Sequence, residues 1–182
     1  MPTKPIANMR RVQFVEDEDS RYYASKAELC AYCGALPTCS LRKSKQQQWR
    51  GLLQKACEAF LPILAFSQPK GLEREFNTFR MGTAWAKRLV PGSLVALMDT
   101  KRDEIIGQAK VTALFTGDKR EMAKAYGEDN HILLSRGIKG LEAEAAMLKV
   151  LRNTFGKLIY ESQEKATVIY LQRVEHERGE TD

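Results

Sequence analysis

The stretch from Phe76 to Gly92, FNTFRMGTAWAKRLVPG, decides the fold, because it combines the signals of a strand, a turn, a short helix and a second turn. Its first residues alternate apolar and polar side chains, which is typical of a strand with one buried face. Thr78 and Arg80 can then face a ligand. The apolar positions expected in the core are Phe76 and either Phe79 or Met81.

A glycine ends this strand, and Thr83 is expected to cap a short helix from Ala84 to Leu89. That helix carries Trp85 on one side, and it carries Lys87 and Arg88 near its C-terminal end, where positive charge is favourable. A Pro-Gly pair closes the following turn. The corner therefore predicts a binding site with an aromatic ring and several positive charges.

The pattern TFRxGxxWxKRLxxG, followed by the apolar run Ser93 to Met98, an aspartate and a hairpin, resembles the ASCH branch of the PUA-like superfamily. Proteins of that kind are small β-barrels that handle RNA or modified nucleobases. The resemblance covers roughly Ala65 to Val174. It implies an α+β fold, with a small mixed PUA-like β-barrel and flanking helices over residues 63–176.

The rest of the chain fits this fold in the order of its elements. Residues 61–75 are expected to be a connector that leads into the first strand of the corner, and residues 105–116 alternate as a return strand should. A short helix is expected up to Tyr126, followed by a loop at residues 127–131. Leu141 to Phe155 has the apolar stripe of an amphipathic helix, and Ala166 to Val174 is expected to close the barrel as a strand.

Composition places the chain among globular proteins with a basic surface. The formal net charge is +6, and the basic excess lies in the first two-thirds of the sequence. A basic surface favours phosphate-rich partners such as nucleic acid, although solubility alone also explains a charge of this size. The longest apolar runs are too short to cross a bilayer, which predicts no membrane association. The expected location is the cytoplasm.

The N-terminal third is expected to be separate from the barrel. Residues 1–20 contain the acidic run Glu16 to Asp19 and predict a mobile arm. Residues 21–62 hold all four cysteines and predict a helical segment stapled by a metal. The candidate ligands are Cys30, Cys33, Cys39 and Cys57.

Four thiolates in a reducing compartment can hold one tetrahedral Zn²⁺ or one [4Fe-4S] cluster, and the spacing leaves both open, with zinc favoured because nothing asks for redox chemistry. Cys57 also has a purely structural interpretation. It lies on the apolar stripe of a helix expected between Trp49 and Phe60, where a cysteine can be a small buried hydrophobe.

The candidate function is recognition of RNA or a modified nucleobase. Arginine and lysine supply charge for phosphates, a tryptophan can stack on a base, and hydroxyl or amide groups can bond its edge. Each group also has a structural interpretation, such as core packing for Trp85. The predicted binding residues are Asn77, Thr78, Arg80, Trp85, Lys87, Arg88 and His131.

Two further functions remain open. Relatives that resemble the corner hydrolyse N4-acylated cytidines with a lysine and, three residues later, a threonine. Thr78 matches the threonine and is the candidate catalytic residue, but the position three before it is Glu75. An activated hydroxyl needs a neighbouring base, so this departure counts against hydrolysis. The third interpretation is a protein-interaction module that binds an acidic protein partner.

Overall fold

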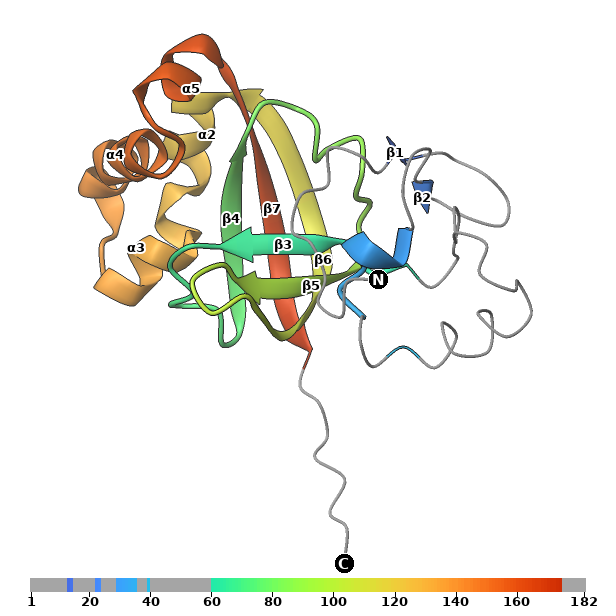
Figure 1. Cartoon of the computed structure of the whole chain (residues 1–182). Helices are drawn as coiled ribbons and strands as arrows, with labels where there is room; N and C mark the ends of the chain where they lie inside the picture. The colour runs from blue at the N-terminus through green and yellow to red at the C-terminus, as the bar shows by residue number, and fades with distance from the viewer. Residues whose placement is uncertain (1–12, 15–21, 24–28, 36–38, 40–59, 175–182) are drawn as a thin grey trace, which may run out of the picture. The chain divides into compact units, whose positions relative to one another are not determined.

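The chain has 182 residues, and this computed structural model describes residues 13–14, 22–23, 29–35, 39 and 60–174 (Figure 1). The chain divides into two compact units. The first unit comprises Met1–Ser67 and Leu94–Gly107, and the second comprises Gln68–Ser93 and Gln108–Asp182. The helix expected at residues 49–60 lies outside the described residues except for its last position.

Among its described residues, the first unit includes the strand pairs β1–β2 and β3–β5. The short strands β1 (Gln13–Phe14) and β2 (Tyr22–Tyr23) pair antiparallel, and η2 (Leu29–Tyr32) is a 3-10 helix. Strand β3 (Ile63–Phe66) pairs in parallel with β5 (Leu94–Asp99). Residues 95–99 are all buried, so the apolar run after the corner forms a strand that is covered on both faces. Strand β3 lies where the sequence predicted a connector, because a buried parallel strand has no alternation to reveal it.

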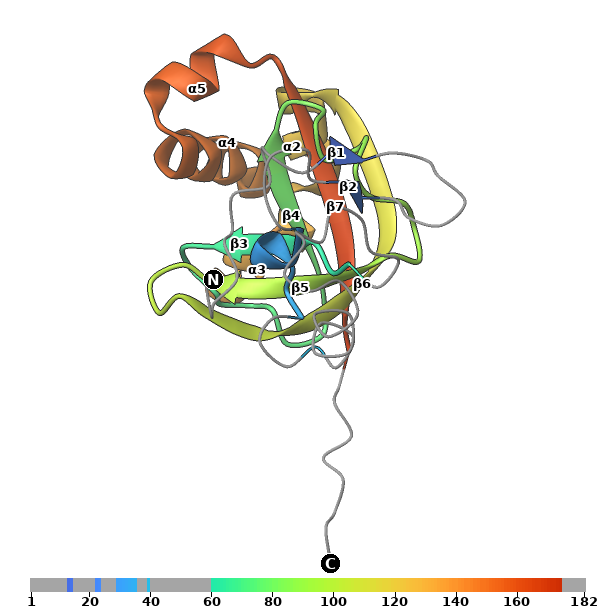
Figure 2. The same cartoon turned by 45° about the vertical axis from the view of Figure 1, so that its right-hand side comes forward.

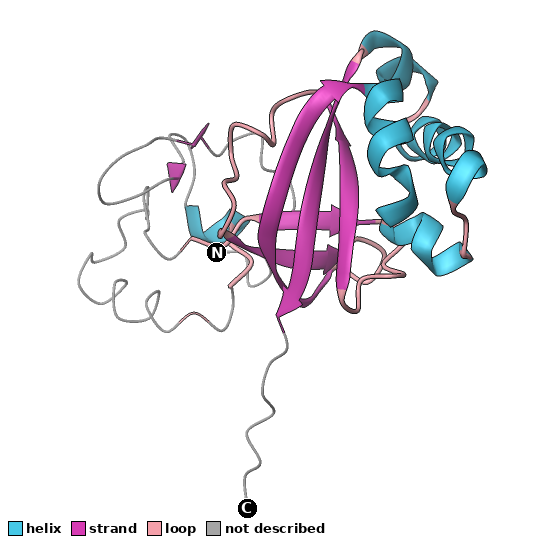
Figure 3. Ribbon diagram, turned by 180° about the vertical axis from the view of Figure 1, so that it is seen from behind, coloured by secondary structure: helices cyan, strands magenta, loops and turns pink. Residues whose placement is uncertain are grey.

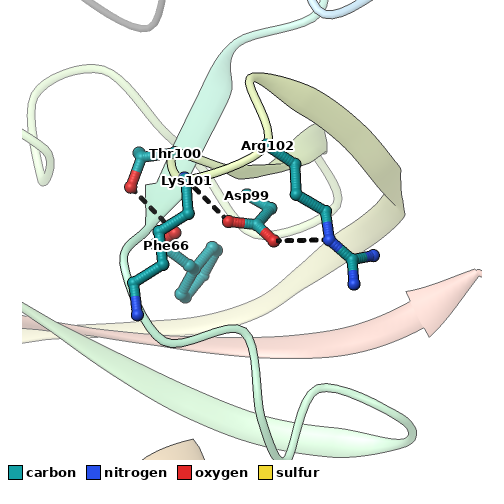
Figure 4. Close-up of polar contacts among 5 residues, drawn as sticks. All are labelled: Phe66, Asp99, Thr100, Lys101 and Arg102. Atoms are coloured by element: carbon teal, nitrogen blue, oxygen red, sulfur yellow. Dashed lines mark hydrogen bonds and ion pairs between the residues drawn. The ribbon is translucent and has the colours of Figure 1, made fainter.

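The hairpin after β5 begins with a buried carboxylate. Asp99 is 6% exposed, and its Oδ1 accepts a hydrogen bond of 2.9 Å from the amide of Lys101 (Figure 4). Its Oδ2 lies 3.8 Å from Nε of Arg102, and the Thr100 hydroxyl donates to the carbonyl of Phe66. The contacts with Lys101 and Arg102 compensate the carboxylate for its burial. The polar turn expected at this place is confirmed.

The second unit is built on three antiparallel strands, which Figure 2 shows side by side. Strand β4 (Glu75–Met81) pairs with β7 (Lys165–Val174), and β7 pairs with β6 (Glu104–Asp118). Only the part of β6 from Gln108 onward belongs to this unit. The register of β6 against β7 shifts between Val111 and Ala113, so Thr112 forms a bulge.

Helices gather on one side of these strands, as Figure 3 shows. They are α2 (Lys119–Tyr126), η3 (Gly127–Asp129), α3 (His131–Arg136), η4 (Gly140–Glu142), α4 (Ala143–Phe155) and α5 (Lys157–Ser162). The core between α2, α3, α4 and the strands contains Phe79, Leu133, Met147, Leu151 and Val168. Strands β3 to β7, which run in mixed directions, and the flanking helices confirm the predicted α+β class, while barrel closure stays a prediction.

Two local predictions are wrong. Residues 84–88 form consecutive turns and not a helix, with the amide of Leu89 donating to the carbonyl of Trp85. The predicted helix would have only the six residues 84–89, enclosed by Gly82 and Pro91, and so short a segment is not stable as a helix without strong packing. The predicted loop at 127–131 contains η3 and the first residue of α3. Asn130 caps α3 by accepting a hydrogen bond from the amide of Ile132.

Candidate functional site

The two faces of β4 differ in chemistry. Side chains alternate along a strand, and residues paired directly across antiparallel strands share a face. Phe79 pairs with Val168 and belongs to the core beneath the helices, so we call that side the helix face. Thr78 and Arg80 lie on the opposite side, which we call the polar face. Phe76 shares the polar face with them, whereas the sequence analysis placed it on the other side.

A row of polar side chains crosses three strands on the polar face. Arg80 of β4 pairs with Thr167 of β7, which in turn pairs with Thr116 of β6. The hydroxyls of Thr167 and Thr116 lie 3.4 Å apart, and Thr167 donates to the carbonyl of Gly82 at 2.7 Å. We call these three residues the polar row. Thr167 is completely buried, whereas Thr116 is exposed, so the row runs from the interior to the surface.

Arg80 brings a positive charge into this row. The residue is half-buried as a whole, and its Nε atom is buried. Desolvation by burial lowers the pKa of Arg80 to about 10, so the guanidinium stays charged at neutral pH. A guanidinium offers several N–H donors in a plane and has no acceptor. The polar row therefore suits a ligand with acceptor oxygens or negative charge.

His131 lies within electrostatic reach of Arg80 and is neutral. Burial lowers the pKa of His131 to about 4, the hydrogen bond to the Lys70 carbonyl opposes this shift, and the charge of Arg80 adds to it. Nδ1 lies 2.8 Å from that carbonyl oxygen. Since a carbonyl only accepts, the neutral ring carries its proton on Nδ1 and presents Nε2 as an acceptor.

The loop before β4 is built around His131. Gly71 has a φ of 70°, and a Cβ there would lie 2.1 Å from the carbonyl oxygen of His131. Only glycine fits so close an approach of two backbones. The ring of Phe76 meets the imidazole edge-on, with centroids 6.2 Å apart. His131 is thus a buried residue that anchors the loop beside the polar face.

Glu75 is not positioned to act as a base for Thr78, the candidate nucleophile. Thr78 is 4% exposed and lies on the polar face. Glu75 stands three residues earlier, which on a strand means the opposite face, and it is exposed. Glu75 therefore cannot activate the hydroxyl, and hydrolysis gains no support from this pair.

Two residues of the corner, Trp85 and Arg88, contact each other. Trp85 is half-buried, and the guanidinium carbon of Arg88 lies 5.6 Å from the centre of its ring. Lys87 is exposed. This Arg-on-Trp contact is a cation–π pair at the surface, where such pairs contribute only modestly. Its ligand-binding role stays a prediction.

Asn77 lies on the helix face and has a structural role. Its Nδ2 donates to the Tyr126 carbonyl at 2.7 Å, and Nδ2 of Asn130 donates to the Asn77 carbonyl at 3.3 Å. Asn77 is completely buried, and within the described part of the chain its Oδ1 has no hydrogen-bond partner. The amide thus ties β4 to the end of α2.

The described cysteines do not assemble a metal site. Among the described residues, no group of three or more His, Cys, Asp or Glu side chains could hold an ion, and Cys57 lies outside them. Cys33 is buried, and its Sγ accepts a hydrogen bond of 3.3 Å from the amide of Leu61. Cys30 and Cys39 are half-buried and form no disulfide. Zinc or iron–sulfur binding stays a prediction.

A depression of about 570 Å³ lies in the second unit, and no residue of the polar row lines it. It lies between the loop before β4 and the end of α3, and none of the predicted site residues lines it. Its lining side chains include basic and acidic groups, among them Lys70, Glu73 and Arg74. Charges of both signs give it no clear preference for a nucleic acid.

Sequence reasoning missed Thr116 and Thr167. Both belong to strands that were predicted, and their polar side chains interrupt otherwise apolar neighbourhoods. The missing information was the register that places them beside Arg80. A pairing of the predicted strands would have been needed to find them.

Comparisons with known proteins give partial structural likenesses. No protein-family model matches the chain, and no curated protein matches it. The ASCH protein of Zymomonas mobilis is 14% identical over 63% of this chain and 66% of that protein, with a TM-score of 0.35. A point mutant of it is 15% identical over 62% and 71%, with a TM-score of 0.37.

The hypothetical protein PH0355 is 19% identical over 57% of this chain and 84% of its own, with a TM-score of 0.39. In the described part of the chain, no helix combines the length and apolar character that crossing a membrane requires.

Proposed function

We propose that the chain binds RNA or a modified nucleoside through the polar row. The observation that most strongly supports this proposal is a charged, partly buried guanidinium aligned with two threonine hydroxyls across three strands. Arginine and hydroxyl side chains are common partners of phosphate and sugar oxygens, and they also bond base edges. The net charge of +6 favours a polyanionic partner. The resemblance of the corner to ASCH proteins supports the same ligand class.

The test is RNA binding by variants of Arg80 measured over a range of salt concentrations. Arg80→Gln removes the charge. Arg80→Lys keeps the charge but loses the planar guanidinium group, whose N–H donors can bind two acceptors side by side. The control is Arg152→Gln, which removes an exposed arginine from α4, far along the chain from the row.

We expect Arg80→Gln to weaken the affinity for a single-stranded RNA about tenfold and to reduce its salt dependence. Arg80→Lys should lie between the wild type and Arg80→Gln. Equal losses for Arg80→Gln and Arg152→Gln would show only a general effect of charge. Failure of the wild type to bind any RNA or nucleoside, together with binding to an acidic protein, would replace the proposal with a protein-interaction module.

A further inference from the structure

Three aromatic rings from three elements meet on the helix face, outside the polar row. Phe115 of β6 stacks on Tyr126 of α2, with centroids 4.6 Å apart and planes inclined by 13°. Tyr170 of β7 meets both rings edge-on at 6.0 Å. Phe115 is nevertheless 37% exposed, although its strand partner Val168 is completely buried. The ring thus has one side against Tyr126 and a substantial surface open to solvent.

Hydrogen bonds hold this cluster in place. The Tyr170 hydroxyl donates to Oδ2 of Asp129 at 2.7 Å, and Nδ2 of Asn77 donates a hydrogen bond to the Tyr126 carbonyl. Burial, followed by the bond to Asp129, raises the pKa of Tyr170 to about 12, so the phenol keeps the proton that it donates. An aromatic surface fixed in this way loses little conformational entropy when another ring stacks on it.

The surface next to Phe115 suits a nucleic-acid strand. Lys110, Ala113 and Phe115 share the helix face of β6, because they pair with alternate residues of β7. Lys110 is exposed, and the bulge residue Thr112 between them is exposed as well. The distance from Lys110 to Phe115 along the strand is roughly 15 Å. The surface therefore offers a positive charge at one end, a flat ring at the other, and small side chains between them.

We propose that Phe115 is a stacking platform for a base of single-stranded RNA, with Lys110 contacting a backbone phosphate of the same strand. Base-on-aromatic stacking and a nearby cation are the two elements of single-strand recognition on sheet surfaces. The proposal rests on the proposed function, to which it adds a second contact on the other face of the same strands. It also specifies the ligand, since a lone nucleoside cannot reach both surfaces.

The experiment compares variants that keep or remove the ring. Phe115→Leu keeps apolar bulk and removes the aromatic face, while Phe115→Tyr keeps the face. Leu158→Ala is the matched control, because Leu158 is an apolar side chain of α5 that is 82% exposed. Binding of a labelled single-stranded RNA and of an abasic strand of the same length is measured by fluorescence anisotropy at fixed salt.

We expect Phe115→Leu to weaken RNA binding about tenfold, within the range for loss of one stacked base. Phe115→Tyr and Leu158→Ala should bind like the wild type, and Lys110→Gln should weaken binding by a smaller factor. With the abasic strand, Phe115→Leu and the wild type should bind equally.

If Phe115→Leu binds RNA like the wild type while Arg80→Gln is weakened, the platform is wrong and the polar row stands. If Phe115→Leu loses affinity equally for the abasic strand, the ring acts only through packing, which also overturns the platform. If the wild type binds a modified nucleoside but no RNA, the platform is wrong and the polar row stands; if it binds neither, both proposals fail.

Discussion

The neighbours Phe79 and Arg80 show how differently the two faces of one strand are used. Phe79 points into the helix face, where it packs with buried residues of α2 and α4. Arg80 points the other way, into a row of hydroxyls, and carries its charge into partly buried surroundings. A protein loses stability by keeping a desolvated charge, so a residue of this kind suggests a function beyond packing. On β4, the comparison separates a residue that holds the fold from a residue available to a ligand.

The largest expected effect belongs to the helix face. Phe79→Ala removes a ring that is 4% exposed and leaves a cavity in the core, so we expect the free energy of unfolding to fall by about 3 to 5 kcal/mol. The measurement is urea unfolding, with Lys149→Ala on the exposed side of α4 as the control. RNA affinity per folded molecule should remain unchanged. A strong loss of RNA affinity in folded Phe79→Ala would mean that the helix face of β4 also contributes to RNA binding.

A second effect comes from the neutral histidine beside Arg80. The pKa of His131 is lowered by burial from 6.5 in the unfolded chain to about 4 in the folded protein. Between these values the unfolded state binds the proton and the folded state does not, so stability falls as the pH drops. The loss is on the order of 3 kcal/mol below pH 4.

This effect is isolated by comparing urea unfolding of the wild type and His131→Gln at pH 7 and pH 4.5. Other groups titrate equally in both proteins, so the variant should lose less stability on acidification than the wild type. Identical losses would mean that His131 is not held neutral beside the polar face.

A smaller effect is expected for the buried hydroxyl of the polar row. Thr167→Val keeps the shape of the side chain and removes the donor to the Gly82 carbonyl, which should lower stability by about 1 kcal/mol. Thr112→Val at the exposed bulge is the matched control and should change stability little. Thermal unfolding measures both. RNA affinity should fall for Thr167→Val alone, and a fall for both threonines would argue against a specific row.

The smallest change in stability is expected for Arg80→Met. This substitution removes a desolvated charge and keeps a long apolar side chain, so the free energy of unfolding should stay within about 1 kcal/mol of the wild type or rise. The same variant should lose RNA affinity. A loss of stability comparable to that of Phe79→Ala would indicate that Arg80 is a structural residue.

Local sequence patterns predicted strands β4 to β7, which belong to both units, and most of α4. Phe76 to Arg80, the strand after the corner, the return strand and the closing strand all lie within observed strands, and the Leu141 helix lies largely in α4. Local patterns of this kind are repeated over many residues, so the secondary structure can be predicted from them. The short β3, α3 and α5 were missed, because four to six residues do not display a period.

The site was less predictable than the fold. Thr78 and Arg80 were correctly placed on one side of a strand, but Asn77 was assigned to the ligand although it faces the helices. Thr116, Thr167 and Phe115 depend on strand register, which no single segment encodes. Trp85 stands in turns where a helix was expected. Pairing across the sheet, and not composition, determines which of these side chains meet.

The most direct test of the polar row is a map of backbone amide chemical shifts in the ¹⁵N-labelled full chain during titration with a short single-stranded RNA. We predict saturable shifts at Thr78, Arg80, Thr116 and Thr167, with the amides of Met147 and Leu151 in the core of α4 unaffected. Shifts that avoid all four of these polar-face residues while binding is saturated would contradict the account.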